Sequence, residues 1–324
     1  MITDKTVFIL GAGASKPYGY PTGRGLRNDI CMNFLNRIEK LALDAGWTPH
    51  DFEIEVKPIA QDFVQAFYKS STPSVDLFLA SNPQFSGIGK RAIVVSILEA
   101  ERGSGFREKV DVKLDWYFHL FTIMTRELTE PKTYKRFGEN KISFITFNYD
   151  RSLEHFLYES LSNRFRAAPE EAIVNELKKI RISHVYGKID ELLWEKRPET
   201  HGVRCGTHYR VRPQYDVVIR MQENIKTIHE ISGQNQNLKD MISQATKIFF
   251  LGFGFAKENL DVLGIPTVLK NDHLIFGTAV DWLEKEIRDI KIVLGKNYNK
   301  PVVRDARCLI RRDLDCRKLL REYL

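Results

Sequence analysis

The 324-residue sequence has no Cys-x-x-Cys pair, although it contains four cysteines, Cys31, Cys205, Cys308 and Cys316. No apolar run approaches the roughly 18 to 20 residues that a membrane-spanning helix needs. The N-terminus also lacks the basic, then apolar, then small-residue order of a secretory signal. These absences argue against a disulfide framework, a zinc module built on paired cysteines and a membrane protein. They predict a protein of the reducing cytoplasm.

Long blocks of like charge are absent as well. The 49 basic and 42 acidic residues give a formal net charge of +7 and are spread along the chain, so direct binding to nucleic acid is not expected. The basic C-terminal run over residues 307–324, "RCLIRRDLDCRKLLREYL", interleaves its charges with apolar residues at helical spacing. This run therefore predicts a docking helix rather than a stripe of charge that follows phosphates.

Strand-like segments alternate with helix-like ones along most of the chain. Thr6 to Leu10 has the composition of a strand buried on both faces and stops at Gly11. From Arg24 to Gly46, apolar residues recur every three or four positions, which predicts a helix. Further candidate strands are "KISFITFNYD", "KIRISHVYG", "YDVVIR", "KIFFLGFGF", "HLIFG" and "KIVLG".

The alternation predicts an α/β fold with a Rossmann-like, doubly wound parallel sheet. Residues from about 47 to 135 stay in helical period, with only turn residues between the periodic segments. We therefore expect a single domain over 1–324. Its core would consist of 1–46 and 136–324, with a helical insertion subdomain at about 47–135.

Four of the predicted strands end in glycine or in polar side chains. The first is followed by "GAGAS", in which Lys16 stands where a dehydrogenase fingerprint would have its third glycine. The other three endings supply Asn148 with Asp150, His184 with Gly187, and Gly252 with Gly254. Because ligands of open α/β sheets bind at the carboxyl ends of the strands, these segments are expected to converge on one crevice.

The ordered motifs "GAGAS", "GYPTG", "TFNYD", "HVYG" and "LGFGF" resemble the sirtuin (silent information regulator) family, and within it the bacterial sirtuin-like domains of anti-phage defence. The similarity extends thinly from about Val7 to Leu263 and includes "SVDLFL". It implies that the protein takes NAD as its substrate. The residues that it assigns to NAD binding are Gly11, Ala12, Gly13, Ser15, Pro21, Thr22, Arg24, Thr146, Asp150, Gly187, Gly252, Gly254 and Phe255.

The resemblance also implies roles for two catalytic residues. Asn148 would orient a water or a ribose hydroxyl at the anomeric carbon, with Asp150 supporting it, and His184 would be the general base. A histidine with an ordinary pKa near 6.5 suits that task at neutral pH. Asp76, in "SVDLFL", is interpreted either as an acid at a helix N-terminus or as a group that orients a pocket residue.

Protein-deacylating sirtuins carry two cysteine pairs that hold zinc, and this sequence has none. Transfer of the ADP-ribosyl group to water remains, so the resemblance implies an NAD glycohydrolase that acts as the effector of an abortive-infection system. A homo-oligomer is expected, with a separate sensor such as a HerA-like ATPase or an argonaute-type subunit. The alternatives are an NAD-dependent protein deacylase or ADP-ribosyltransferase, and a non-catalytic sensor of NAD or ADP-ribose.

Two further expectations concern metal binding and regulation. His201, Cys205 and His208 form the nearest approach to a metal-ligand cluster, but they lack a fourth ligand and no zinc is expected. The aromatic segment "DWYFHLFTIMTREL" holds more aromatic residues than one helix face needs. This excess favours the hypothesis that oligomerisation or a partner rearranges the helical insertion over the pocket.

Overall fold

The computed structural model describes residues 1–104, 110–195, 206–231, 235–298 and 300–324. Its centre is one six-stranded sheet in which all neighbouring strands are parallel, in the order β3-β2-β1-β4-β5-β6. This confirms the predicted α/β class and the doubly wound parallel sheet. The strands are β1 (Thr6–Leu10), β2 (Ile142–Thr146), β3 (Arg181–His184), β4 (Lys247–Leu251), β5 (Leu274–Thr278) and β6 (Cys308–Arg311).

The middle of the sheet is apolar on both faces. All five residues of β1 are buried, and the ring of Phe8 stacks between Phe144 and Phe249 at centroid distances of 5.2 and 5.3 Å. The chain adds β2 and β3 on one side of β1 and then returns to add β4 on the other. The strand order therefore reverses between β1 and β4, which is where doubly wound folds place their ligands.

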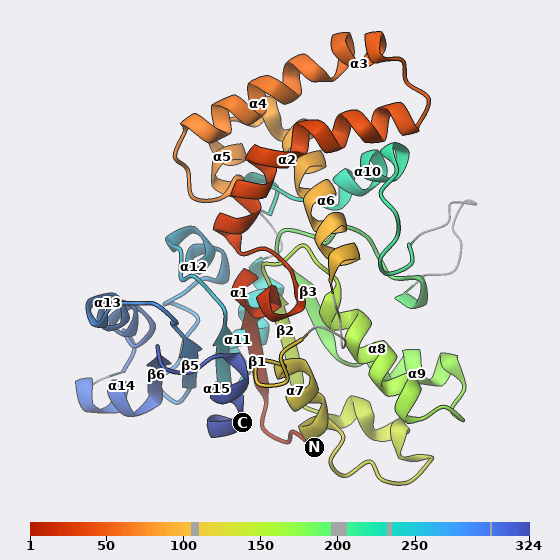
Figure 1. Ribbon diagram of the computed structural model, residues 1–324. Helices are drawn as coiled ribbons and strands as arrows, with labels where there is room; N and C mark the ends of the chain where they lie inside the picture. Colours follow the sequence, from red (N-terminus) through yellow and green to blue (C-terminus); the bar gives the residue numbers. More distant parts are fainter. Residues whose placement is uncertain (105–109, 196–205, 232–234, 299) are drawn as a thin grey trace.

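Helices cover the sheet and extend beyond one edge of it (Figure 1). One group lies beyond the carboxyl ends of the strands and consists of α2 (Gly23–Asp44), α3 (Pro49–Glu55), α4 (Lys57–Lys69), α5 (Val75–Ser81), α6 (Ser86–Gly103) and α10 (Tyr215–Met221). We call this group the helical part. The other helices are α1 (Ala12–Ser15), α7 (Trp116–Met124), α8 (Ser152–Arg164), α9 (Glu170–Leu177), α11 (Asn235–Ser243), α12 (Lys257–Leu263), α13 (Glu284–Leu294), α14 (Pro301–Arg307) and α15 (Cys316–Tyr323).

The helical part has different limits from the predicted insertion over 47–135. It begins at Gly23, because α2 packs against α4 and α6. It also includes α10, which comes from the connection between β3 and β4 and packs against α6 and α2. In contrast α7 lies within the predicted insertion but packs against α8 and α15.

Two predicted strands are wrong. "YDVVIR" forms α10, whose buried residues Tyr215, Val218 and Met221 are three apart, as on one face of a helix. "KIVLG" provides the last turn of α13 rather than a strand. The sixth strand is instead β6, which lies inside the run over 307–324 that was predicted to be a docking helix. In that run α15 is the helical segment, and it packs within the chain against α7 and β5.

A buried ion pair joins the helical part to the sheet. Arg151, just after β2, donates through Nε and Nη2 to the two carboxylate oxygens of Glu101 on α6, at 3.0 and 2.9 Å, and both side chains are 0% exposed. Nη1 of the same guanidinium donates to Thr207 Oγ1 at 2.7 Å. Such a bidentate pair fixes the orientation of the two side chains as well as the distance between them.

None of the helices among the described residues has both the length and the apolar character needed to cross a membrane.

Candidate functional site

The turns that follow β1 and β4 pack directly against each other at the point where the strand order reverses. The N–H of Gly11 donates to Leu251 O, and that of Gly13 to Gly252 O, both at 3.0 Å. A β-carbon on Gly252 would lie 2.1 Å from Ala14 N, and the φ of Gly252 is +55°. Glycine is therefore required here by the contact between the two turns as well as by the backbone conformation.

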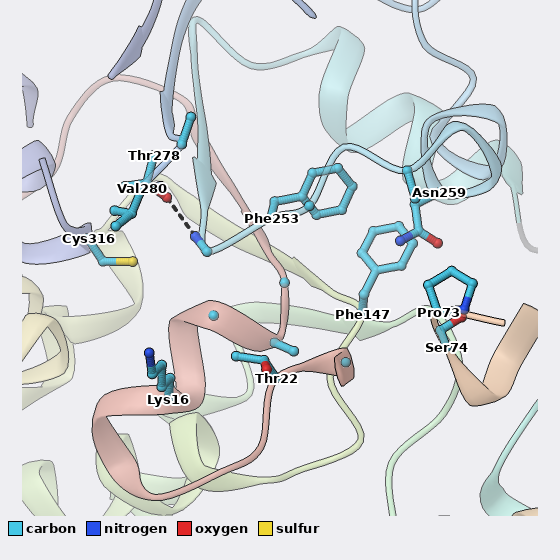
Figure 2. A pocket seen from close by; sticks show the side chains of 18 of the residues that line it. Lys16, Thr22, Pro73, Ser74, Phe147, Phe253, Asn259, Thr278, Val280 and Cys316 are labelled. Carbon is cyan, nitrogen blue, oxygen red and sulfur yellow. Dashed lines mark hydrogen bonds between the residues drawn. The ribbon is translucent and has the colours of Figure 1, made fainter. Parts of the chain in front are cut away.

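A cavity of about 930 Å³ lies beside these turns, within the size range of small-molecule and cofactor sites. Figure 2 shows Thr278, Val280 and Cys316 at one end of it, and Ser74 with Asn259 at the other. The glycine turns and Thr22 lie between these ends. The cavity thus has one wall from the sheet edge and one from the helical part.

Six of the residues predicted to bind NAD line this cavity: Gly11, Ala12, Gly13, Thr22, Gly252 and Gly254. The other predicted site residues are not among its lining residues: Ser15, Pro21, Arg24, Thr146, Asn148, Asp150, His184, Gly187 and Phe255. Among the described lining residues Lys16 supplies the basic side chain, whereas the acidic ones are Asp76, Asp111, Glu258, Asp281 and Asp315. The cavity is therefore predominantly acidic.

Asn148 lies directly behind the first glycine turn. Its Nδ2 donates to Gly11 O at 3.1 Å and to Ser15 Oγ at 2.9 Å. Its Oδ1 is buried and has no hydrogen-bond partner within the part of the chain that the structure describes. Because buried polar atoms are normally paired, this oxygen has an unused capacity to accept a hydrogen bond.

Asp150 is linked to Asn148 through the hydroxyl of Ser15. Its Oδ1 accepts from the backbone N–H of Ser152 at 3.0 Å and from the Ser152 hydroxyl. Burial raises the pKa of the Asp150 carboxyl, and hydrogen bonds from Ser152 and Ser15 partly offset that rise. Since Ser15 also accepts from Asn148, the arrangement is consistent with the supporting role predicted for Asp150.

His184, at the end of β3, has both ring nitrogens occupied. Nδ1 lies 3.0 Å from Asn148 O, and Nε2 lies 2.6 Å from Glu154 Oε1 on α8. A carbonyl and a carboxylate both accept, so the protonated ring satisfies both contacts. Burial opposes that charge, but the Glu154 carboxylate outweighs burial and raises the pKa of His184. The predicted general base thus has no free nitrogen in this geometry, and its predicted role receives no support here.

The partner of His184 belongs to a wider buried charge network. Burial opposes ionisation of Glu154, yet His184 and Lys188 together lower the pKa of its carboxyl to about 2. Lys188 Nζ also lies 2.6 Å from Glu195 and 2.8 Å from Glu191. Burial, followed by repulsion from Glu154, raises the pKa of Glu195 to about 7. Burial and the neighbouring carboxylate thus favour the protonated form of Glu195.

The predicted site residues do not include the polar side chains at the α5 end of the cavity. Asp76 lines it from α5 and accepts from the Tyr149 hydroxyl. Tyr186 lines it as well, and its hydroxyl donates to Asn259 Oδ1 at 2.7 Å. The sequence carries a signal for each, since one interpretation of Asp76 is a group that orients a pocket residue and Tyr186 lies inside "HVYG". No local pattern indicates that the helix of Asp76 reaches the sheet edge.

The aromatic helix α7 mostly packs into the core. Trp116 and Tyr117 are buried. Trp116 Nε1 donates to Ala14 O at 2.8 Å, and this hydrogen bond stabilises the turn that follows β1. Phe121 is buried too, whereas Phe118 is 60% exposed.

Among the described residues no group of three or more metal-binding side chains occurs. His201 and Cys205 lie outside the described residues, so the predicted cluster with His208 cannot be placed.

A scan against models of known protein families found no match to this chain. A search of curated proteins found no match either.

Proposed function

We propose that the protein binds NAD in the cavity between the two glycine turns and hydrolyses it to nicotinamide and ADP-ribose. The observation that carries this proposal is the position of the cavity. It lies where the strand order reverses, and both turns line it. Doubly wound sheets bind nucleotides at this point, and the cavity is large enough for an extended ligand.

The proposed reaction is a substitution at the anomeric carbon of the nicotinamide ribose. The bond between C1′ and the ring nitrogen breaks, and its electron pair neutralises the cationic ring. The resulting oxocarbenium ion takes the oxygen of a water at C1′, and one water proton leaves to solvent. A protein can accelerate such a step by positioning the water and by stabilising the developing charge.

Asn148 is the residue to which we assign the positioning of that water, and because it lies behind the first glycine turn and not in the cavity lining, the water would have to enter beside that turn. Its Oδ1 has no hydrogen-bond partner among the residues that the structure describes, while its Nδ2 is fixed by Gly11 and Ser15. We assign His184 a positioning role, because it holds the carbonyl of Asn148 rather than presenting a free nitrogen. That same geometry favours a second candidate function, in which the protein binds NAD or ADP-ribose without hydrolysing it.

The biological setting stays a proposal of the same kind. We propose that the protein is the effector of an abortive-infection system and acts as a homo-oligomer. A separate sensor protein, such as a HerA-like ATPase or an argonaute-type subunit, would activate it. The helical part supplies one wall of the cavity through α5. Its displacement by a partner or by oligomerisation would therefore change the site directly.

The proposal is tested by two measurements on the whole chain. Calorimetric titration with ADP-ribose reports binding, and chromatography of NAD incubated over a range of protein concentrations reports release of nicotinamide. Asn148→Ala is expected to lower release at least about 100-fold, the scale of losing one transition-state contact. The matched control is Asn163→Ala, at an exposed position of α8.

Each outcome has a distinct meaning. Release by the wild type and by Asn163→Ala but not by Asn148→Ala supports the glycohydrolase. Binding of ADP-ribose without release of nicotinamide at any concentration supports the non-catalytic sensor. Absence of binding at millimolar ADP-ribose would refute a dinucleotide site in this cavity.

A further inference from the structure

Asp76 brings a carboxyl group from the helical part to the edge of the sheet. It lies in the first turn of α5, whose N-terminus is capped by Ser74 accepting from Leu77 N at 3.3 Å. Tyr149, the residue next to Asn148, donates its hydroxyl hydrogen to Asp76 Oδ1 and thereby fixes the carboxyl. Figure 2 shows Ser74 beside Asn259 and Phe147, at the end of the cavity away from Cys316.

This carboxyl group has no cationic partner among the described residues. Its hydrogen bond comes from a neutral phenol, and Lys16, the basic side chain of the lining, appears in Figure 2 well apart from the Ser74 end. Burial raises the pKa of Asp76, and the Tyr149 hydrogen bond only partly offsets this rise. A carboxylate desolvated in a cavity without a counter-charge is poised for a ligand that carries the charge.

We propose that the Asp76 carboxylate faces the nicotinamide ribose and pairs with the positive charge of the bound substrate. The inference rests on the proposed function and adds a catalytic residue to it. In bound NAD the charge is spread over the nicotinamide ring. As the bond to C1′ breaks, the charge moves to C1′ and the ribose ring oxygen. A carboxylate beside the ribose stabilises this second distribution more strongly, so it accelerates the reaction as well as aiding binding.

The assignment also orients the ligand in the cavity. The nicotinamide ribose lies at the Asp76 end, near Tyr186 and Asn259, and the diphosphate passes the glycine turns. The adenosine then occupies the end formed by Thr278, Val280 and Cys316. Asn148 is next to Tyr149 in the chain, so both proposed catalytic groups are held by one short segment.

The charge pairing is measured without turnover by comparing two ligands. One is carba-NAD, in which a methylene replaces the ring oxygen of the nicotinamide ribose so that the bond is not cleaved. The other is its dihydro form, which keeps the diphosphate but has an uncharged nicotinamide ring. We call the first the cationic form, because its nicotinamide ring carries a positive charge. The wild type is expected to bind the cationic form about tenfold more tightly, as a screened pair at a few ångströms implies. Asp76→Asn keeps an oxygen for the Tyr149 hydroxyl, and it is expected to bind the two forms equally.

Three controls make the result specific. ADP-ribose lacks the cationic ring, so Asp76→Asn should bind it within threefold of wild type. Asp62→Asn makes the same change of charge at an exposed position of α4 and should retain the tenfold preference. Release of nicotinamide from NAD should fall at least about 100-fold in Asp76→Asn. Unchanged thermal unfolding would show that this variant folds.

The inference is overturned if the wild type binds both carba-NAD forms equally, or if Asp76→Asn keeps the preference for the cationic form. Either result would leave the dinucleotide site itself intact. Failure of the wild type to bind carba-NAD and ADP-ribose alike would overturn the proposed function and this inference together.

Discussion

The contact between the two glycine turns makes a quantitative prediction for Gly252→Ala. The φ of +55° costs an L-residue roughly 1 to 2 kcal/mol. The new β-carbon would lie 2.1 Å from Ala14 N, so the turns must separate, and the hydrogen bond from Gly13 N to Gly252 O is lost. That bond is worth about 1 kcal/mol. The free energy of unfolding should therefore fall by about 2 to 3 kcal/mol, equivalent to a drop in Tm of about 3 to 4 °C for a domain of this size.

Gly254→Ala is the matched control for this experiment. Gly254 is two residues away and also lines the cavity, but a β-carbon there would meet no atom within 4 Å. Its unfolding midpoint in urea and its Tm should equal those of the wild type. Its added methyl would lie in the space proposed for the ligand, so its affinity for ADP-ribose should fall.

Two outcomes would refute this reasoning. One is a Gly252→Ala variant as stable as the wild type, which would mean that the turns do not pack as the structure has them. The other is an equal loss of stability in Gly254→Ala, which would mean that glycine is required there for the fold rather than for space beside the ligand.

Three further predictions concern the contacts around the site. Arg151→Met leaves Glu101 buried without its partner, so the free energy of unfolding measured in urea should fall by about 3 to 5 kcal/mol. The double variant Arg151→Met with Glu101→Leu should recover part of this loss, because no unpaired charge is then buried. A double variant as unstable as Arg151→Met would contradict this. The lowered pKa of Glu154 stabilises the folded state above pH 4.5, and this stabilisation is lost between pH 4.5 and about 2. Glu154→Gln should therefore be less stable than wild type by up to about 3 kcal/mol at pH 7, with a difference that shrinks towards pH 2 in denaturant titrations; a gap independent of pH would disprove it. Trp116→Phe removes the N–H that donates to Ala14 O, and the free energy of unfolding from thermal melts should fall by about 1 to 3 kcal/mol. An unchanged stability would show that this hydrogen bond is dispensable.

The sequence predicted the central strands because burial on both faces leaves a continuous apolar run. β1 and β4 are such runs, and both end at glycine. The same criterion failed for α10 and α13, whose β-branched residues resemble strand composition although their buried positions follow helical spacing. β6 was missed because only Cys308 and Ile310 of its four residues are buried.

The site was predictable where it depends on strand ends and was not where it depends on packing between distant segments. The glycine turns were found because each follows a strand directly. Asp76 was ambiguous, because its importance arises from a contact with Tyr149, 73 residues later. His184 looked like a free base in the sequence, and only the placement of α8 brings Glu154 against its ring.

The segment from Phe147 to Arg151 gives each of its five residues a different neighbour. Phe147 lies against Phe253, Asn148 against Gly11, Tyr149 against Asp76, Asp150 against Ser152, and Arg151 against Glu101. A strand with one face towards solvent can change freely at every second position, but here all five residues are buried. Substitutions along this segment therefore need compensating changes in five separate places, so in evolution it should change as a unit or hardly at all.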